Sequence, residues 1–118
     1  LFKEGTPQQL RKSLDRLHRV YSEHPQWIYM ENALAGNYQN GDYIVDTYAS
    51  MVDILLCADS FERAVELAIR MGGDSSTRAA LVGSLAGLIY TDQPQGWMEI
   101  EKIEEIERLA LTAWLKIQ

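Results

Sequence analysis

The sequence predicts an all-α protein, a compact orthogonal helical bundle of about six helices. Apolar residues recur at spacings of three and four over most of the chain, which is typical of helices with one buried face. Proline, glycine and asparagine separate these stretches, so each has the length of an ordinary helix. No stretch is a convincing strand, and no repeat with the period of a helical solenoid is present.

Three helices are expected before residue 59. The first spans about 7–24, where Pro25 closes it, and its apolar face carries Leu10, Leu14, Leu17 and Tyr21. The second spans about 26–38, before the turn signal Asn40-Gly41. The third spans about 43–58 and is apolar around most of its circumference, so we expect it to be central. The single cysteine, Cys57, is expected to be a buried, inert thiol near its end.

Three more helices are expected after residue 59. Asp59 and Glu62 have the spacing of a capping box for a helix that Gly72 ends in a left-handed cap. The next helix begins at the hydroxyls of residues 75–77 and runs to about residue 90. Its small residues recur at every fourth position and let another helix approach closely; they are Ala79, Gly83 and Gly87. After a break over 91–96, the last helix spans about 98–117 and directs inward Ile100, Ile103, Ile106, Leu109, Ala113 and Trp114.

Length and composition restrict the class of protein. The 118 residues are enough for one domain, and 47% of them are apolar, which is enough to form a core. The formal net charge of −6 opposes binding to nucleic acid. No apolar run reaches the roughly 20 residues of a membrane span, and no signal peptide is visible, so we expect no membrane and a cytoplasmic protein. Because the chain starts at Leu1, residues 1–118 are expected to be a single helical domain or a segment of a larger one.

Polar atoms concentrate in one stretch, Gly72-Gly73-Asp74-Ser75-Ser76-Thr77-Arg78. In a purely structural interpretation, the glycines end one helix, and Asp74, Ser75 or Ser76 caps the next. In a functional interpretation, a carboxylate followed at two and three residues by hydroxyls offers the hard oxygen ligands that Mg²⁺ prefers. One carboxylate is too few for a complete cation site, so further ligands would have to come from elsewhere.

A series of short motifs in a fixed order adds a family resemblance. The motifs are 41–47 (GDYIVDT), 60–65 (SFERAV), 72–74 (GGD), 80–87 (ALVGSLAG) and 94–97 (PQGW). Together they resemble the C-terminal part of ADP-ribosylglycohydrolases, in which the loop reads Gly-Gly-Asp-Thr-Asp-Thr and binds metal through both aspartates and the last threonine. The resemblance implies metal contacts from Asp74, Ser76 and Thr77. Because Ser76 replaces the second aspartate, binding of Mg²⁺ or Mn²⁺ is expected to be weak or lost.

The charge of Arg78, directly after the loop, suggests a substrate-binding role. Its guanidinium is expected to pair with Asp74 or with a substrate phosphate. Three other carboxylates, those of Glu31, Asp42 and Asp46, are expected to be solvated or to cap helices. The sequence identifies no catalytic residue.

The resemblance implies the C-terminal part of a protein that, when complete, hydrolyses a glycosidic bond to ADP-ribose with a divalent metal. Its expected partners are an ADP-ribosylated substrate or ADP-ribose, and the N-terminal half of the complete protein. The chain alone is expected to be inactive. One alternative is a non-catalytic helical binding or scaffold module derived from the same fold, which the loss of a carboxylate at Ser76 favours. Another is a helical interaction domain unrelated to the family.

Overall fold

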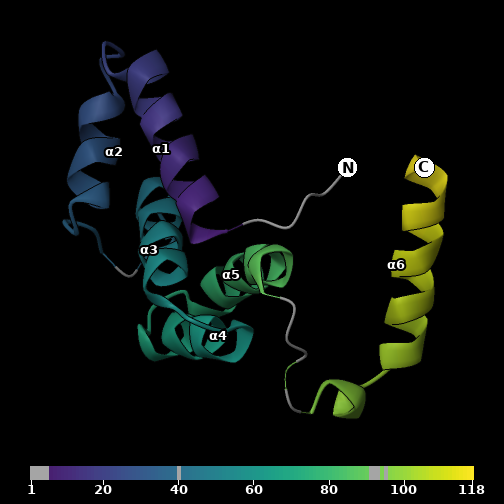
Figure 1. Cartoon of the computed structure of the whole chain (residues 1–118). Coiled ribbons are helices and arrows are strands. Elements are labelled where there is room, and N and C mark those ends of the chain that lie inside the picture. The colour runs from purple at the N-terminus through teal and green to yellow at the C-terminus, as the bar shows by residue number, and fades with distance from the viewer. Residues whose placement is uncertain (1–5, 40, 91–93, 95) are drawn as a thin grey trace.

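The computed structural model describes residues 6–39, 41–90, 94 and 96–118 (Figure 1). Within these ranges the chain forms six α-helices, one short 3₁₀-helix and no strand, which confirms the all-α prediction. Residue 40 of the expected turn and most of the expected break over 91–96 lie outside the described residues. The elements are α1 (Pro7–Tyr21), α2 (Trp27–Leu34), α3 (Ile44–Cys57), α4 (Phe61–Arg70), α5 (Ser75–Ile89), η1 (Trp97–Glu99) and α6 (Ile103–Ile117).

The first two helices, α1 and α2, are shorter than expected. α1 begins at a capping box, in which the Thr6 hydroxyl accepts from the backbone N–H of Gln9 and the Gln9 side chain accepts from that of Thr6. α1 stops short of residue 24 because His24 precedes a proline, and a residue in that position disfavours the helical conformation. α2 stops before Gly36 instead of reaching residue 38, because Gly36 has a left-handed φ of 89°.

The central element is α3, as the sequence predicts. It packs against α2, α4 and α5 and, to a smaller extent, α1. Its buried residues lie all round the helix and are Thr47, Ala49, Ser50, Met51, Val52, Ile54 and Leu55. The prediction of a buried cysteine is wrong, because the Cys57 thiol is exposed. Cys57 is the last residue of α3. An apolar run in the sequence does not show which side of the helix end other helices cover.

The helices α4 and α5 lie side by side and pack on α3 (Figure 1). The small-residue stripe of α5 faces α4, as expected. A methyl group added at Gly83 would lie 3.7 Å from Val65 Cγ2, and one added at Gly87 would lie 3.9 Å from Phe61 Cε2. The core that forms where α3, α4 and α5 meet contains Met51, Ile54, Leu55, Ala58, Ala64, Ala68, Val82 and Ala86.

The capping residue of α4 is Ser60. Its hydroxyl accepts a hydrogen bond from the backbone N–H of Arg63. The predicted capping box of Asp59 and Glu62 is therefore wrong, because the residue with extended backbone at the helix start is one position later.

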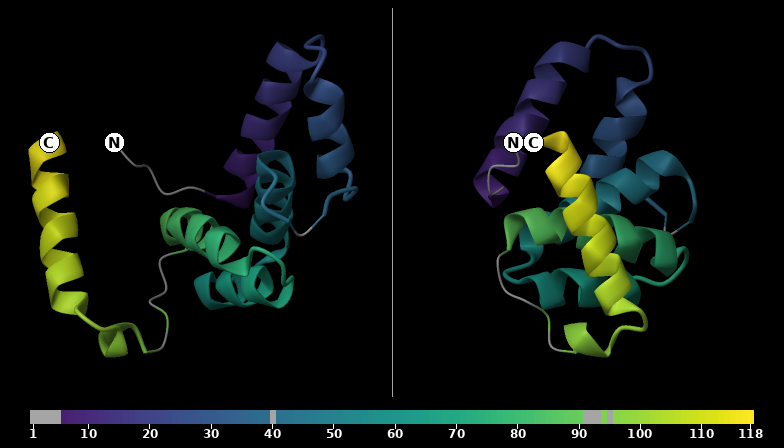
Figure 2. Two further views of the ribbon diagram at one scale, coloured as in Figure 1. Left: turned by 180° about the vertical axis from the view of Figure 1, so that it is seen from behind. Right: turned by 90° about the vertical axis from the view of Figure 1, so that its right-hand side faces the viewer.

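The last helix, α6, stands away from the body formed by α1 to α5 (Figures 1 and 2). Its most extensive contact with another element is with η1, and Ile103 is its one buried residue. The predicted inward face is wrong beyond this residue, because the other members, Ile100, Ile106, Leu109, Ala113 and Trp114, are exposed. The helix also begins at residue 103 instead of 98, since Lys102 has a left-handed φ of 61°.

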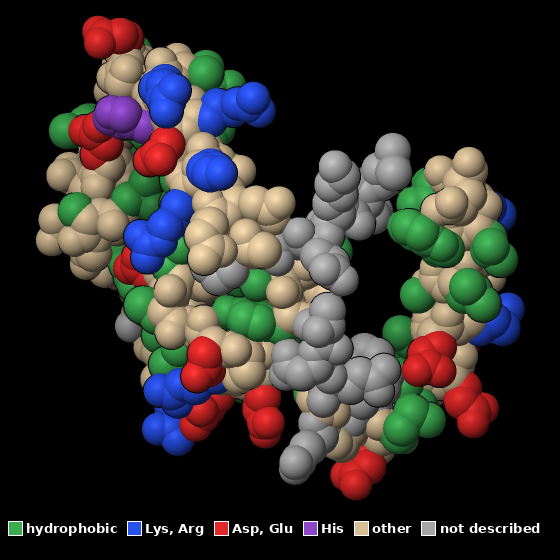
Figure 3. Space-filling view, viewed as in Figure 1, with side chains coloured by type: hydrophobic (Ala, Val, Ile, Leu, Met, Phe, Trp, Pro, Cys, Tyr) green, Lys and Arg blue, Asp and Glu red, His purple; other side chains and the backbone are tan. Residues whose placement is uncertain are grey.

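The position of α6 makes the molecule less compact than the sequence predicts. The radius of gyration is 15.8 Å, whereas a compact domain of this length has about 13.5 Å. Figure 3 shows hydrophobic side chains along α6 and basic side chains along α1. None of the described helices is both long enough and apolar enough to cross a membrane.

Candidate functional site

The Gly72–Thr77 loop joins α4 to the first turn of α5. Both glycines have left-handed backbones, with φ of 70° at Gly72 and 61° at Gly73, which confirms the expected left-handed end of α4. The N–H of Ser75 donates to the carbonyl of Gly73 at 2.8 Å. The chain thereby turns within a few residues, since α4 ends at Arg70 and α5 begins at Ser75.

Asp74 is the N-cap of α5, so the structural interpretation of this loop is correct. Its Oδ1 accepts from the backbone N–H of Thr77 at 3.4 Å. The hydroxyl of Ser76 donates to the same oxygen at 3.4 Å. Asp74 is partly buried, whereas Ser76 and Thr77 are exposed. The structure thus brings all three residues implied as metal ligands to one helix start.

This donor set suits a hard divalent cation in type. A carboxylate and two hydroxyls are the oxygen ligands that Mg²⁺ or Mn²⁺ takes. Asp74 Oδ1 is occupied by two hydrogen bonds in the structure. With one carboxylate in the set, these residues fit as part of a cation site, and its other ligands have to be supplied from elsewhere.

Arg78 lies under the loop, in the interior. Its side chain is 0% exposed and is the largest of the fully buried side chains among the described residues. Nε donates to Ser50 Oγ at 2.9 Å, and Nη1 donates to the carbonyl oxygen of Gly72 at 2.8 Å. Nη2 is buried and has no hydrogen-bond partner in the described part of the chain. The expected ion pair with Asp74 is not formed among the described residues, where the guanidinium contacts Ser50 and Gly72 instead.

The Tyr38 hydroxyl lies close enough to Asp53 and to Arg78 for both charges to act on it. Burial raises the pKa of the Tyr38 hydroxyl above its ordinary value of 10.0. The hydrogen bond between Tyr38 and Asp53, together with the negative charge of Asp53, raises this pKa further, while the positive charge of Arg78 lowers it. One charged side chain from α3 and one from α5 thus act on the same hydroxyl.

The other carboxylates considered from the sequence lie in different surroundings. Glu31 accepts from Trp27 Nε1 at 3.0 Å and lies 3.3 Å from His18 Nδ1. Asp42 is exposed, and Asp46 lies in the first turn of α3. In the ranges that the structure describes, no three His, Cys, Asp or Glu side chains gather closely enough to hold a metal ion.

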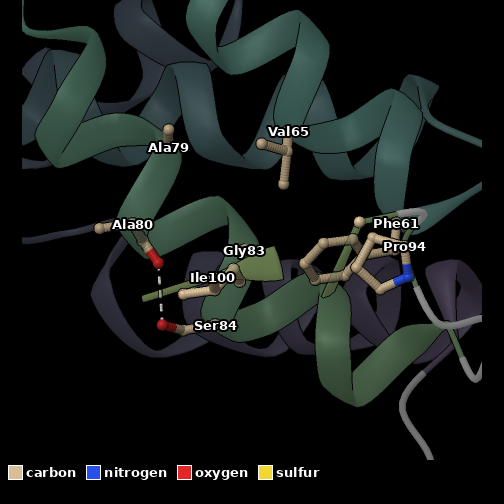
Figure 4. Close-up of a pocket in the computed structure, with 9 residues that line it drawn as sticks. Phe61, Val65, Ala79, Ala80, Gly83, Ser84, Pro94 and Ile100 are labelled. Atoms are coloured by element: carbon tan, nitrogen blue, oxygen red, sulfur yellow. Dashed lines mark hydrogen bonds between the residues drawn. The ribbon is translucent and has the colours of Figure 1, made fainter. Parts of the chain in front are cut away.

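An apolar groove of about 390 Å³ runs beside the contact of α4 and α5 (Figure 4). Its wall includes the phenyl ring of Phe61, the α5 backbone at Gly83 and the side chain of Ile100. The hydroxyl of Ser84 donates to the carbonyl oxygen of Ala80 at 2.8 Å. Because its lining is mostly apolar, the groove has few polar groups that could recognise a ligand by hydrogen bonds.

Sequence reasoning missed Ser50 and the burial of Arg78. A signal for the second was available: Arg78, Val82 and Ala86 recur at every fourth position, and all three are buried on α5. Arg78 therefore continues the apolar face of its own helix toward the N-terminus. No comparable signal marks Ser50 among its apolar neighbours on α3.

Fold and loop together define an all-α protein in which a carboxylate and two hydroxyls gather at the start of α5, a helix that packs on the core. The family model described as ADP-ribosylglycohydrolase matches residues 2–118. The chain belongs to the ADP-ribosylglycohydrolase family, and the interpretation as an unrelated interaction domain is wrong.

One curated relative matches part of the chain. The chain is 37% identical over 62 residues to the ADP-ribosyl-[dinitrogen reductase] glycohydrolase of Rhodospirillum rubrum. The match covers 51% of this chain and 21% of the relative, so it spans about a fifth of that protein's length. No solved structure matches the chain.

Proposed function

We propose that this chain contributes the metal-binding loop to a larger ADP-ribosylglycohydrolase that hydrolyses a glycosidic bond to ADP-ribose. The observation that carries the proposal is the gathering of Asp74, Ser76 and Thr77 at the start of α5, in a member of this family. The name of the relative from Rhodospirillum rubrum supports an ADP-ribosylated protein as the substrate. The further ligands would have to come from a longer protein, and an N-terminal half that supplies them stays a prediction.

A divalent cation, when bound, would orient the ribose and an attacking water. Asp74 would hold it through a carboxylate oxygen, and Ser76 and Thr77 would add neutral hydroxyls. Ser76 brings no charge, so Mg²⁺ or Mn²⁺ is held more weakly than by two carboxylates. The start of α5 also favours the negative charge of a substrate phosphate. Direct phosphate contact by Arg78 stays a prediction, since the guanidinium would have to leave Ser50 and Gly72 to make it.

A second candidate is a non-catalytic helical module that binds a partner with the same fold. Ser76 favours this second candidate, because its hydroxyl donates a hydrogen bond to Asp74 and adds no negative charge. In this case Asp74 serves only as the N-cap of α5, a role that needs no metal. The two candidates therefore differ in what happens when a divalent cation is offered.

The deciding experiment is a calorimetric titration of the 118-residue chain and of any longer parent protein with Mn²⁺ and then with ADP-ribose. We expect Mn²⁺ to bind the parent, and Asp74→Ala to abolish that binding. The matched control is Asp59→Ala, because Asp59 is an exposed aspartate at the start of the neighbouring helix and should leave Mn²⁺ binding unchanged. Absence of binding by both wild-type proteins would refute the hydrolase proposal and favour the non-catalytic module.

A further inference from the structure

Burial of Arg78 is costly, so its presence needs a reason. A charge that leaves water is expensive unless it is paired and fully hydrogen-bonded. Arg78 has a buried Nη2 without a hydrogen-bond partner among the described residues. It is also the fourth residue of α5, near the positive end of the helix dipole. An apolar side chain of similar volume is often as stable or more stable at a buried site. Stability of the fold alone therefore does not account for an arginine here.

The hydrogen bonds of Arg78 join three parts of the chain. Nη1 holds the carbonyl of Gly72, the first residue of the loop, at 2.8 Å. Nε holds Ser50 on α3 at 2.9 Å. The Ser50 hydroxyl donates its own proton to the carbonyl of Thr47 at 3.0 Å, which leaves its lone pairs for Arg78. The rigid planar fork of one guanidinium thus fixes the loop relative to α3, and a single lysine ammonium cannot reproduce this arrangement.

We propose that Arg78 is a positioning residue, which holds the Gly72 carbonyl against α3 and thereby sets the place of Asp74 at the start of α5. The loop needs such an anchor, because glycine has the greatest backbone freedom of any residue type, and Gly72 and Gly73 both lie in the loop. Asp74 follows these glycines directly and depends on them for its position. The consequence for metal binding rests on the proposed function; the consequence for loop order does not.

Hydrogen exchange tests the role in loop order without any ligand. In the 118-residue chain, Arg78→Met removes both hydrogen bonds and keeps an apolar stem. We expect the amides of Ser75 and Thr77, whose acceptors lie within the loop, to exchange about tenfold faster, as loss of one or two hydrogen bonds implies. The amides of the α3 core should change much less. The control Arg70→Met alters an exposed arginine of α4 and should leave the loop amides unchanged.

Uniform acceleration across the loop and the α3 core would overturn the proposal, because it would indicate a general stabilising role. Unchanged loop amides would overturn it as well. Ser50→Ala keeps the inference testable if Arg78→Met does not fold, since it removes only the Nε acceptor. We expect Ser50→Ala to accelerate the same loop amides by a smaller factor, and no acceleration would count against the proposal.

A Mn²⁺ titration tests the consequence for the metal in whichever wild-type protein, the chain or its parent, binds Mn²⁺. We expect Arg78→Lys to keep the fold and weaken Mn²⁺ binding about tenfold, because the charge remains but the fork is lost. Unchanged Mn²⁺ affinity with an altered loop would overturn the link between loop position and the metal. If neither wild-type protein binds Mn²⁺, the proposed function fails, and hydrogen exchange still decides the role of Arg78.

Discussion

Replacing glycine by alanine should have opposite effects at Gly83 and Gly72. Gly83 lies inside α5, where glycine is about 1 kcal/mol less favourable than alanine. The added methyl would lie 3.7 Å from Val65 and 4.0 Å from Phe61, which is ordinary van der Waals contact. Burial of that methyl contributes up to about 0.8 kcal/mol more. We therefore expect Gly83→Ala to raise the free energy of unfolding by about 1 kcal/mol.

Gly72 offers as much room but the wrong backbone. A methyl there would meet no atom within 4 Å, yet φ is 70°. An alanine in this left-handed conformation costs roughly 1–2 kcal/mol, so Gly72→Ala should lower the free energy of unfolding by about 1 kcal/mol after the gain from a stiffer unfolded chain. Urea denaturation of both variants beside the wild type measures the two changes. Destabilisation by Gly83→Ala would refute the stated helix spacing, and stabilisation by Gly72→Ala would refute the left-handed loop.

Two further measurements test the core and the surface. Leu55→Ala should lower the free energy of unfolding by about 2–5 kcal/mol, because Leu55 is 0% exposed; Leu115→Ala on exposed α6 is the control in the same urea titration, and equal losses would contradict the described core. The hydrogen bond from Arg63 lowers the pKa of Glu66 below its ordinary 4.5. The contribution of this ion pair to the free energy of unfolding should therefore be present above pH 4.5. It should be lost as the pH falls through the lowered pKa of Glu66. Because the Glu66 side chain is 40% exposed, the measurement is NMR titration of its carboxyl in wild type and in Arg63→Gln. An unchanged midpoint in the variant would contradict this ion pair.

Local signals in the sequence were sufficient for the helices and for the loop between α4 and α5. The left-handed Gly72 and the capping Asp74 depend on a few consecutive residues, so the sequence contains the information that fixes them. The central place of α3 follows from apolar residues all round the helix. Helix ends were less predictable, because Asp59 and Ser60 are adjacent and both residue types cap helices, so the sequence alone does not decide which one caps α4.

Features set by distant parts of the chain were not predictable. Ser50 and Arg78 are 28 positions apart, and no periodicity links them. The side of α3 left uncovered at Cys57 depends on where α2, α4 and α5 end. An apolar stripe on α6 shows that the helix can be buried, but it does not show which surface covers it. Metal ligands beyond Asp74, Ser76 and Thr77 stay a prediction, because the described residues hold no group of three His, Cys, Asp or Glu side chains that could bind a metal ion.

The separation of α6 has a consequence for the cooperativity of unfolding. Isolated helices shorter than about 12–15 residues are marginal in water. α6 has 15 residues, at the edge of this range, and most of its side chains are in solvent. The body of α3, α4 and α5 shares one core and should lose its structure in a single step. Helix content should therefore fall in two parts on heating, a gradual one from α6 and a steep one from the core, and a single free energy of unfolding describes only the second.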